Sequence, residues 1–420
     1  MLECITWGEV YTVWPQRIRF GGQGSKTDDL QTLVVIYIRI MPTKPCTQCG
    51  KTFRTKAEYT SHLETHLAEI PKPAVPEGRL AISLFSGAGG DTLGMERAGL
   101  KVVAFSENNA KAVATHKAVW PESKWLGESV KGDITKIPDS EFEAYTGKIF
   151  MMFAGFPCQG FSNAGKKAAS DPRNRMFYEF LRAVRIVQPQ WIMGENVAGL
   201  LTKKTDDGQS SVIDVIQQCF SEIGYPIVFN VYEMTSVGVP QSRKRIAIVG
   251  NRLSIPFTLP TFTEPKCGLL EIAEPSMEGA LATNLDIPDE CLVKIPEEAE
   301  PTGTPHPYLV KKHSENLISF RKRDSPIHSE VLDLRKACKT LICAYTFQPR
   351  LYVGLVKPSG KKFIRCLTIR EAAQIQGFPA DHAFSGSRDD AIKQIGNAVP
   401  AKFITQMVQA MIASSGNTPL

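Results

Sequence analysis

Cys158 is the residue whose surroundings most favour covalent chemistry in this chain. It lies in the run Gly155-Phe156-Pro157-Cys158-Gln159-Gly160-Phe161-Ser162, directly after a strand-like stretch at 149–154. A single cysteine is more often a buried structural residue, but proline and glycine neighbours favour a loop. A loop at the carboxyl end of a central strand faces the ligand cleft of an α/β sheet. The pattern therefore indicates an exposed thiol, which can act as a nucleophile once it is ionised.

A second set of chemically capable residues has metal-ligand spacing and consists of Cys46, Cys49, His62 and His66. Two thiolates and two imidazoles one helical turn apart can close a tetrahedron around Zn²⁺. The unit resembles a Cys2His2 zinc finger. Such a small unit has almost no core, so zinc should supply most of its folding free energy, on the order of 10 kcal/mol. If the finger reads DNA, its base-facing residues are Thr55, Glu58 and Ser61, and they cover only about 3 bp.

A glycine-rich turn indicates a nucleotide-like ligand. Phe85-Ser86-Gly87-Ala88-Gly89-Gly90 follows one strand-like run and precedes a helical pattern. Its glycines permit a tight turn and close approach of a ligand to the backbone, although an ordinary β–α turn has the same pattern. Glu107, at the end of the next strand, can accept hydrogen bonds from ribose hydroxyls, and Asp133, followed by Ile134, is placed to meet an adenine amino group. Together these features indicate an adenosyl cofactor.

Six motifs, in order, resemble those of the DNA cytosine-5-methyltransferase family. Beside the glycine-rich turn they are Pro157-Cys158-Gln159, Glu195-Asn196-Val197, Gln241-Ser242-Arg243-Lys244-Arg245, Arg370-Glu371-Ala372-Ala373 to Gly377-Phe378-Pro379, and Gly396-Asn397-Ala398-Val399. They extend over residues 79–250 and 365–412. Each motif alone could be a turn or a surface charge pair, but six in this order identify a resemblance.

The resemblance implies a reaction and a role for each residue. Cys158 would attack C6 of a cytosine that is flipped out of duplex DNA, and C5 would take the methyl group of S-adenosylmethionine. Glu195, when protonated, would donate to N3, and Arg245 would bind O2 with support from Arg243. The cofactor would be held by Phe85, Gly87, Gly89, Glu107, Asp133, Ile134, Pro157, Met176, Asn397 and Ala398. The base that removes the C5 proton stays open, with water as one option.

The elements that must position these residues alternate between strands and helices. Strand-like runs occupy 80–85, 102–105, 149–154, 191–194, 227–232 and 246–250. Helical patterns occupy 91–98, 176–186, 210–223 and the region from 365, where an apolar stripe extends over 403–412. Such alternation predicts an α/β fold, a doubly wound sheet of parallel strands with helices on both faces. The resemblance implies the Rossmann-like domain of S-adenosylmethionine-dependent methyltransferases.

The composition changes along the chain in a way that suggests separate parts. Residues 1–40 form an extension without an assigned role, unless Met41 is the true start; 41–68 form the zinc finger and 69–78 a proline-rich linker. The catalytic domain comprises 79–252 and 365–420. The irregular, partly β region 253–364 takes the place of the family's target-recognition region. Residues 264–300 contain ten acidic and two basic residues, and residues 301–366 contain thirteen basic and four acidic ones, so the second half favours a polyanion.

Overall composition is that of a globular protein. The chain has 420 residues, 43% hydrophobic and 22% charged, with a net charge of +6 that permits but does not demand a nucleic-acid partner. Its ten cysteines, without a leader peptide, predict reduced intracellular thiols. No apolar run is long enough to span a bilayer. We expect double-stranded DNA as the partner, a monomeric catalytic core, and a location with the bacterial or phage nucleoid in the cytoplasm or, in a eukaryote, in the nucleus.

Two other functions remain open from the sequence. The first is RNA methylation, because a branch that resembles this family modifies tRNA cytosine; the long region 253–364 and the finger argue against it. The second is a catalytically inactive DNA-binding relative, against which the intact Cys158, Glu195 and Arg245 argue. Methyl transfer to duplex DNA, to tRNA or to neither separates the three functions.

Overall fold

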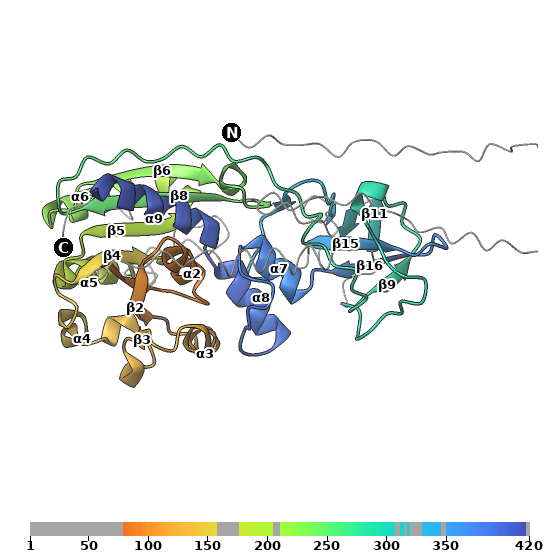
Figure 1. Ribbon diagram of the computed structural model, residues 1–420, viewed down its shortest axis with the longest axis horizontal. Helices are drawn as coiled ribbons and strands as arrows, with labels where there is room; N and C mark the ends of the chain where they lie inside the picture. The colour runs from red at the N-terminus through yellow and green to blue at the C-terminus, as the bar shows by residue number, and fades with distance from the viewer. Residues whose placement is uncertain are drawn as a thin grey trace, which may run out of the picture. The chain divides into compact units, whose positions relative to one another are not determined.

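A seven-stranded sheet forms the centre of the catalytic part of the chain (Figure 1). The computed structural model describes residues 79–157, 176–204, 211–306, 311–314, 317–319, 330–345 and 350–416. Within them the strand order is β3-β2-β1-β4-β5-β8-β6. The N-terminal extension, the expected finger and the linker lie outside the described residues, as does the segment 158–175.

All six expected runs form strands of this sheet. They are β1 (Leu80–Leu84), β2 (Lys101–Ser106), β4 (Ile149–Ala154), β5 (Trp191–Val197), β6 (Ile227–Glu233) and β8 (Lys244–Asn251), and β3 (Lys124–Trp125) adds a short edge. Their side chains alternate between two cores: Met152 and Ala154 of β4 join one cluster, and Met151 and Phe153 join the other. Because both faces are covered, these strands appear in the sequence as continuous apolar runs.

Helices cover both faces of the sheet, as predicted. On one face lie α2 (Gly90–Arg97) and α9 (Ala401–Ser415), which pack through Met95, Phe403 and Met407 (Figure 1). On the other face lie α5 (Met176–Val187) and α6 (Val212–Glu222), which pack through Phe180 and Ile216. The connections carry α3 (Ala110–Val119), α4 (Asp139–Glu143), η1 (Glu128–Val130), η2 (Ile134–Lys136), η4 (Ala198–Thr202) and η5 (Met234–Val237). None of the described helices is long and apolar enough to cross a membrane.

One strand departs from the predicted parallel sheet. β8 runs antiparallel to both of its neighbours, β5 and β6, so the prediction of a wholly parallel sheet is wrong at this strand. The reason is the short connection: only residues 234–243 separate β6 from β8, whereas a parallel crossover needs about a dozen residues or more, usually with a helix. The antiparallel direction brings the start of β8 beside the end of β5.

A smaller β region lies between β8 and the last helices. Its main sheet has the order β10-β15-β16-β9, with β13 on the side of β15. The strands are β9 (Leu281–Thr283), β10 (Leu292–Lys294), β13 (Glu330–Val331), β15 (Leu351–Val356) and β16 (Lys362–Cys366), and η6 (Asp289–Cys291) precedes β10. Two further pairs are β11 (Lys311–Ser314) with β12 (Leu317–Ser319), and β14 (Cys338–Lys339) with β7 (Gln241–Ser242). The second pair joins the small region to the catalytic part.

Residues 253–264 run back along the large sheet before the chain enters the small region. The ring of Phe257 meets that of Trp191 edge-on at 5.1 Å, and the ring of Phe262 lies 5.3 Å from that of Tyr232. The amide of Glu264 donates to the carbonyl of Ser236 at 2.9 Å. These contacts place the first residues of the expected insertion on the catalytic core.

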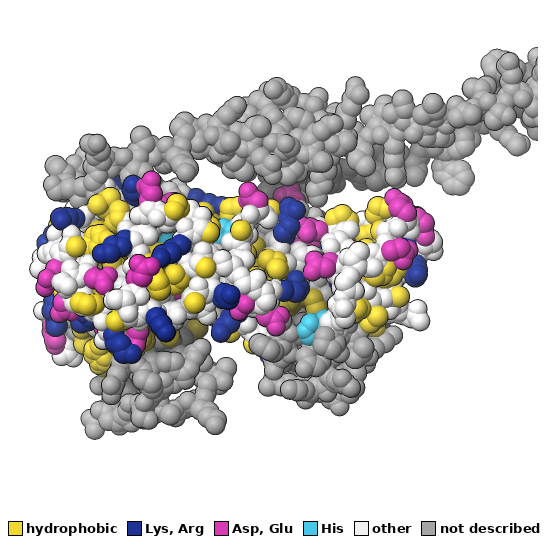
Figure 2. Space-filling view, turned by 90° about the horizontal axis from the view of Figure 1, so that it is seen from below, with side chains coloured by type: hydrophobic (Ala, Val, Ile, Leu, Met, Phe, Trp, Pro, Cys, Tyr) yellow, Lys and Arg dark blue, Asp and Glu magenta, His cyan; other side chains and the backbone are white. Residues whose placement is uncertain are grey.

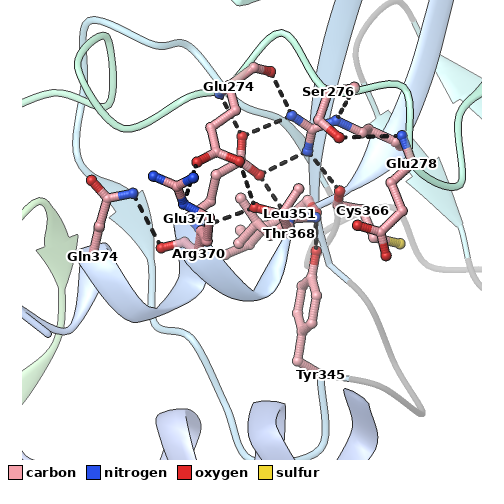
Figure 3. A network of polar contacts seen from close by, with 12 residues as sticks. Glu274, Ser276, Glu278, Tyr345, Leu351, Cys366, Thr368, Arg370, Glu371 and Gln374 are labelled. Carbon is pink, nitrogen blue, oxygen red and sulfur yellow. Dashed lines mark hydrogen bonds and ion pairs between the residues drawn. The ribbon is translucent and has the colours of Figure 1, made fainter. Parts of the chain in front are cut away.

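A buried ion pair joins the small sheet to α7 (Ile369–Ile375) (Figure 3). Arg365, on β16, donates to both carboxylate oxygens of Glu371 at 2.7 and 2.8 Å, and both side chains are 0% exposed. The guanidinium also donates to the carbonyls of Glu274 and Ser276. Glu371 completes a capping box with Thr368 at the start of α7, and α8 (Arg388–Asn397) follows with a capping box of its own.

Candidate active site

One cavity of about 740 Å³ opens at the carboxyl ends of the central strands, where the sequence analysis expects the ligand cleft. Of the predicted cofactor and catalytic residues, the wall of this cavity contains Phe85, Gly87, Glu107, Asp133, Ile134, Pro157, Met176, Glu195, Arg243, Arg245, Asn397 and Ala398. The fold thus gathers into one space residues from both ends of the catalytic part of the chain.

The remaining predicted residues lie elsewhere. Gly89 supports the wall from behind: its φ is +85°, and a Cβ there would lie 2.3 Å from the ring of Trp120. Cys158 is outside the described residues, although Pro157, directly before it, lines the cavity. The predicted zinc ligands Cys46, Cys49, His62 and His66 are also outside the described residues. Within the described part of the chain, no three His, Cys, Asp or Glu side chains are grouped to hold a metal ion.

The turn after β1 leaves open space for a ligand. Phe85 and Gly87 have left-handed φ values of 57° and 55°, and the amide of Phe85 donates to the hydroxyl of Ser106 at 3.3 Å. A Cβ added to Gly87 would meet no atom within 4 Å. The backbone here faces the cavity without a side chain, so a ligand can approach it closely.

Backbone amides hold Glu107, which directly follows β2. The amide of Gly87 donates to one carboxylate oxygen at 2.9 Å, and the amides of Asn108 and Asn109 donate to the other at 2.9 and 2.7 Å. Burial raises the pKa of Glu107, and these three donors oppose that effect. The carboxylate is oriented before any ligand binds, and one oxygen keeps an acceptor site for a hydroxyl.

Asp133 lies on the neighbouring loop and caps the short helix η2. Its carboxylate accepts from the hydroxyl of Thr135 at 2.7 Å and pairs with the ammonium of Lys136 at 2.9 Å, and these two partners lower its pKa. Gly132 has a φ of +70°, and a Cβ there would lie 1.9 Å from the carbonyl oxygen of Glu107. Only glycine lets this loop lie against the end of β2, which brings Asp133 and Glu107 to the same side of the cavity.

Glu195 and Arg245 face each other because β5 and β8 are antiparallel. Arg245 is opposite Val197, and Glu195 is two residues before Val197 on the same face of the sheet. The Nε atom of Arg245 is 2.8 Å from Oε1 of Glu195, yet that oxygen receives no hydrogen bond of acceptable geometry. We interpret the contact as an ion pair whose N–H does not point at the oxygen. The buried carboxylate thus keeps a free acceptor site.

Arg243 lies behind this pair, and its backbone amide donates to the carboxylate of Glu233 at 2.8 Å. Its guanidinium donates to the carbonyls of Leu341, Gly396 and Ala398 at 3.4, 3.2 and 3.3 Å. Burial, with the charge of Arg245 beside it, lowers the pKa of Arg243 to about 9. The carbonyls at the end of α8 carry the negative end of the helix dipole, which favours a cation there.

Several residues of the site have no role in the sequence-based prediction. Asn196, buried in β5, donates to the carbonyl of Phe156 at 3.2 Å and so holds the start of the loop that leads to Cys158. Asn109, beside Glu107, could have been found as a helix N-cap, because its side chain accepts from two amides of α3. Residues 340–343 form another part of the wall. No local pattern marks them, since their partners lie about a hundred positions away.

Residues 80–413 match the family model described as C-5 cytosine-specific DNA methylase. Among curated proteins, the chain is 31% identical over 357 residues to Type II methyltransferase M.PspPI of Psychrobacter sp. (strain TA137), with 80% of each chain covered. It is 29% identical over 347 residues to Type II methyltransferase M.FnuDI of Fusobacterium nucleatum, covering 76% of this chain and 90% of that one. It is 32% identical over 333 residues to Type II methyltransferase M.Eco47II of Escherichia coli, covering 76% and 75%.

Solved structures of methyltransferases share the fold. The S. pombe Dnmt2 methyltransferase superimposes with a TM-score of 0.55 at 15% identity, over 81% of this chain and all of that one (100%). The Entamoeba histolytica methyltransferase EhMeth superimposes with a TM-score of 0.52 at 16% identity, over 80% and 98%. With the sheet order, these likenesses confirm the predicted mixed α/β methyltransferase fold.

Proposed function

Because the chain belongs to the C-5 cytosine-specific DNA methylases and is an S-adenosylmethionine-dependent DNA cytosine methyltransferase, we propose that Cys158 is its nucleophile and that Glu195 and Arg245 hold the target base. The observation that carries this proposal is that one cavity, at the carboxyl ends of the strands, contains both sets of residues. Glu107 and Gly87 line one part of it, and Glu195 and Arg245 line another. Two ligands that share one space can react with each other.

The described residues fit an adenosyl cofactor. Glu107 offers an oriented carboxylate for ribose hydroxyls, the open backbone at Gly87 leaves room beside it, and Asp133 lies on the same side. Other residues of the cavity wall that would hold the cofactor are Phe85, Ile134, Pro157, Met176, Asn397 and Ala398, and Gly89 would act only by shaping the wall. When bound, S-adenosylmethionine supplies a methyl group that is activated by the positive sulfonium.

The chain's own residues prepare cytosine to accept that methyl group. The Cys158 thiolate forms a bond to C6. The electrons of the C5–C6 double bond shift toward C5 and N3, which makes C5 nucleophilic like the carbon of an enamine. C5 would then take the methyl group that bound S-adenosylmethionine supplies, with the thioether of the donor as the leaving group. Loss of the C5 proton to a base, for which water suffices, restores the double bond and expels the thiolate. The cytosine must first leave the base stack, at about a few kcal/mol.

Glu195 and Arg245 recognise the base in this scheme. The free acceptor site on Glu195 suits the exocyclic amine, and the protonated acid donates to N3 as negative charge develops on the ring. Arg245, already 2.8 Å from Glu195, donates to O2. Arg243 supports Arg245 from behind, because it lies two residues before Arg245, directly before the start of β8, and is fixed by three carbonyls.

We further propose that region 253–364 recognises duplex DNA and that Cys46, Cys49, His62 and His66 hold a structural zinc ion. Figure 2 shows basic and acidic side chains interspersed over the described residues of one face. The described residues of that face form no concentrated basic surface, so the proposal that the region binds DNA rests on its basic half, with Lys311-Lys312 on β11 and Arg321-Lys322-Arg323. The names of the relatives, Type II methyltransferases, support duplex DNA over tRNA and a role in restriction–modification.

The test replaces the nucleophile. Cys158→Ala should abolish transfer of tritiated methyl groups to duplex DNA and leave S-adenosylmethionine binding, measured by calorimetry, within several-fold, because the cofactor contacts other residues. Cys267→Ala, at an exposed cysteine, is the matched control and should retain activity. Turnover in Cys158→Ala would remove this residue from the mechanism, and transfer to tRNA instead of DNA would overturn the substrate.

A further inference from the structure

A segment of the small β region forms part of the reaction cavity. Residues 338–343, which we call the roof segment, lie alongside β7. The amide of Cys338 donates to the carbonyl of Pro240 at 3.0 Å, and the hydroxyl of Thr340 donates to the carbonyl of Ser242 at 2.6 Å. Thr340 to Cys343 line the cavity. The wall is therefore complete only when the roof segment is seated on the catalytic part.

Two buried glutamines connect the roof segment to the end of α8. Oε1 of Gln241 accepts from the amide of Leu341 at 2.9 Å, and its Nε2 donates to Oε1 of Gln376 at 3.1 Å. Nε2 of Gln376 then donates to the carbonyl of Ile395 at 2.9 Å. Both glutamines are 0% exposed. This series of hydrogen bonds begins at a backbone N–H and ends at a backbone carbonyl. The positions of the oxygen and nitrogen of each side-chain amide are therefore fixed.

Close packing reinforces the connection. Gly396 touches the roof segment so tightly that a Cβ there would lie 2.5 Å from the amide nitrogen of Cys343. Arg243 links the same two parts, because it donates to the carbonyls of Leu341 and Gly396. The end of α8 also presents Asn397 and Ala398 to the cavity. A shift of the roof segment must therefore shift the residues on the cofactor side.

We propose that Gln376 is a positioning residue that, through Gln241, couples the seating of the roof segment to the placement of residues 396–398. The proposal rests on the proposed function, in which those residues contact the cofactor and the small region contacts DNA. Cofactor binding then favours the seated roof segment, and the seated segment favours DNA binding. By linkage, each ligand raises the affinity for the other by the same factor.

The experiment measures that factor on the full chain. Duplex DNA affinity is determined by anisotropy with and without saturating S-adenosylhomocysteine, which cannot donate a methyl group, and S-adenosylhomocysteine affinity is determined by calorimetry with and without DNA. For the wild type we expect both measurements to give the same enhancement, in the range of about 5–150-fold typical of allosteric coupling.

Gln376→Met keeps the length of the side chain but removes all three of its hydrogen bonds, which include a long one from Nε2 to the carbonyl of Ala398 at 3.5 Å. It should reduce the coupling to within about twofold of unity while each ligand still binds alone. Gln374→Met is the matched control: this glutamine lies in α7, two residues before Gln376, and its side chain donates to the carbonyl of Arg370 at 3.3 Å, within the same helix. The coupling should remain in this variant. Gln376→Met/Gln241→Met should lose no more coupling than Gln376→Met, because the two amides act as one link.

Gln376→Glu makes the coupling depend on pH, a result that a general loss of stability would not produce. The ionised carboxylate can accept from Gln241 but cannot donate to Ile395, whereas the protonated acid can do both. Coupling should therefore be low at alkaline pH and recover as the pH falls, and this variant also serves if Gln376→Met fails to fold. Full coupling in a folded Gln376→Met, or no pH-dependent recovery in Gln376→Glu, overturns the proposal. A wild type that binds both ligands without coupling overturns it too, whereas a wild type that binds no S-adenosylhomocysteine overturns the proposed function.

Discussion

At the scale of single residues, the proposed base pocket contains a carboxylate that is buried but not fully hydrogen-bonded. Glu195 is 7% exposed, and Arg245 is close enough to stabilise its charge without pointing a hydrogen at it. An unpaired buried acceptor is unfavourable in the free protein. A cytosine that brings its amine to this oxygen would supply the missing donor.

Glu195→Gln should therefore lower kcat for methyl transfer by at least about 100-fold, a typical effect of losing a positioned acid, with a smaller loss of DNA affinity. Glutamine keeps the shape but cannot protonate N3. Single-turnover methylation and anisotropy measure the two effects. Glu222→Gln, at an exposed carboxylate ending α6, should behave as wild type. A rate within threefold of wild type in Glu195→Gln would contradict the assigned role.

Asp91 is a second buried carboxyl group, beside the glycine-rich turn. It is 3% exposed and accepts from the hydroxyl of Ser83. Burial raises its pKa to about 7, from an ordinary value of 3.8. A raised pKa means that the folded state holds the proton more tightly than the unfolded state. This contribution to stability is complete below pH 4 and is lost as the pH rises through 7.

Asp91→Asn should remove this dependence, because an amide stays neutral. Relative to wild type, the variant should gain stability between pH 4 and pH 8, by up to about 4 kcal/mol. Thermal unfolding of both proteins across this range gives the difference. Asp214→Asn, at an exposed aspartate in the first turn of α6, should show a flat difference. A flat difference for Asp91→Asn as well would mean that Asp91 is ionised throughout.

At the scale of elements, the Arg365–Glu371 pair fixes β16 against α7 (Figure 3). Every oxygen of Glu371 and the terminal nitrogens of Arg365 have partners. A buried pair of this kind adds little net stability compared with well-packed apolar residues, but removing one partner leaves an uncompensated charge. The pair therefore specifies how the small region joins the catalytic part.

Glu371→Ala should lower the free energy of unfolding by about 3–5 kcal/mol. Arg370→Ala is a close control, since Arg370 pairs with Glu274 at 3.1 Å but is 64% exposed, and its loss should cost no more than about 1 kcal/mol. Urea unfolding of the three proteins measures both. If Arg365→Met/Glu371→Leu is not more stable than Glu371→Ala, the buried charge is not the cause of the loss.

At the scale of the whole molecule, we propose that the expected finger and the inserted region contribute differently to DNA binding. The inserted region contacts the catalytic part at several places, among them β14 on β7, Phe257 on Trp191, and the amide of Glu274, which donates to Glu371 at 2.8 Å. One finger reads only about 3 bp. The proline-rich linker predicted at 69–78 would not fix the finger against the catalytic cleft. The inserted region should thus determine which cytosines are methylated.

Deleting residues 1–70 should leave the methylated sequence unchanged and weaken DNA binding. Each lost phosphate contact removes about 0.9 from the slope of log affinity against log salt, so the slope should flatten by about one to three units. Bisulfite sequencing and a salt titration of both proteins provide the measurements. A changed set of methylated cytosines would make the finger a specificity element.

The sequence by itself determined the reaction class and most of the central sheet. The motifs carry local signals: Pro157 before Cys158 marks a loop, and glycines mark a turn that only they can make. The runs that became β1, β4 and β5 are recognisable because strands buried on both faces are continuously apolar. These features depend on residues a few positions apart, which is the range over which a pattern can be read.

Tertiary structure alone decided how the motifs meet. The direction of β8 followed from its short connection, and this direction set Arg245 beside Glu195. The roof segment has no periodicity of its own. It lines the cavity because Gln241 accepts a hydrogen bond from it and because Gly396, which lacks a side chain, lets it approach closely. Contacts of this kind result from packing between whole elements, and packing complementarity leaves no signal in the order of nearby residues.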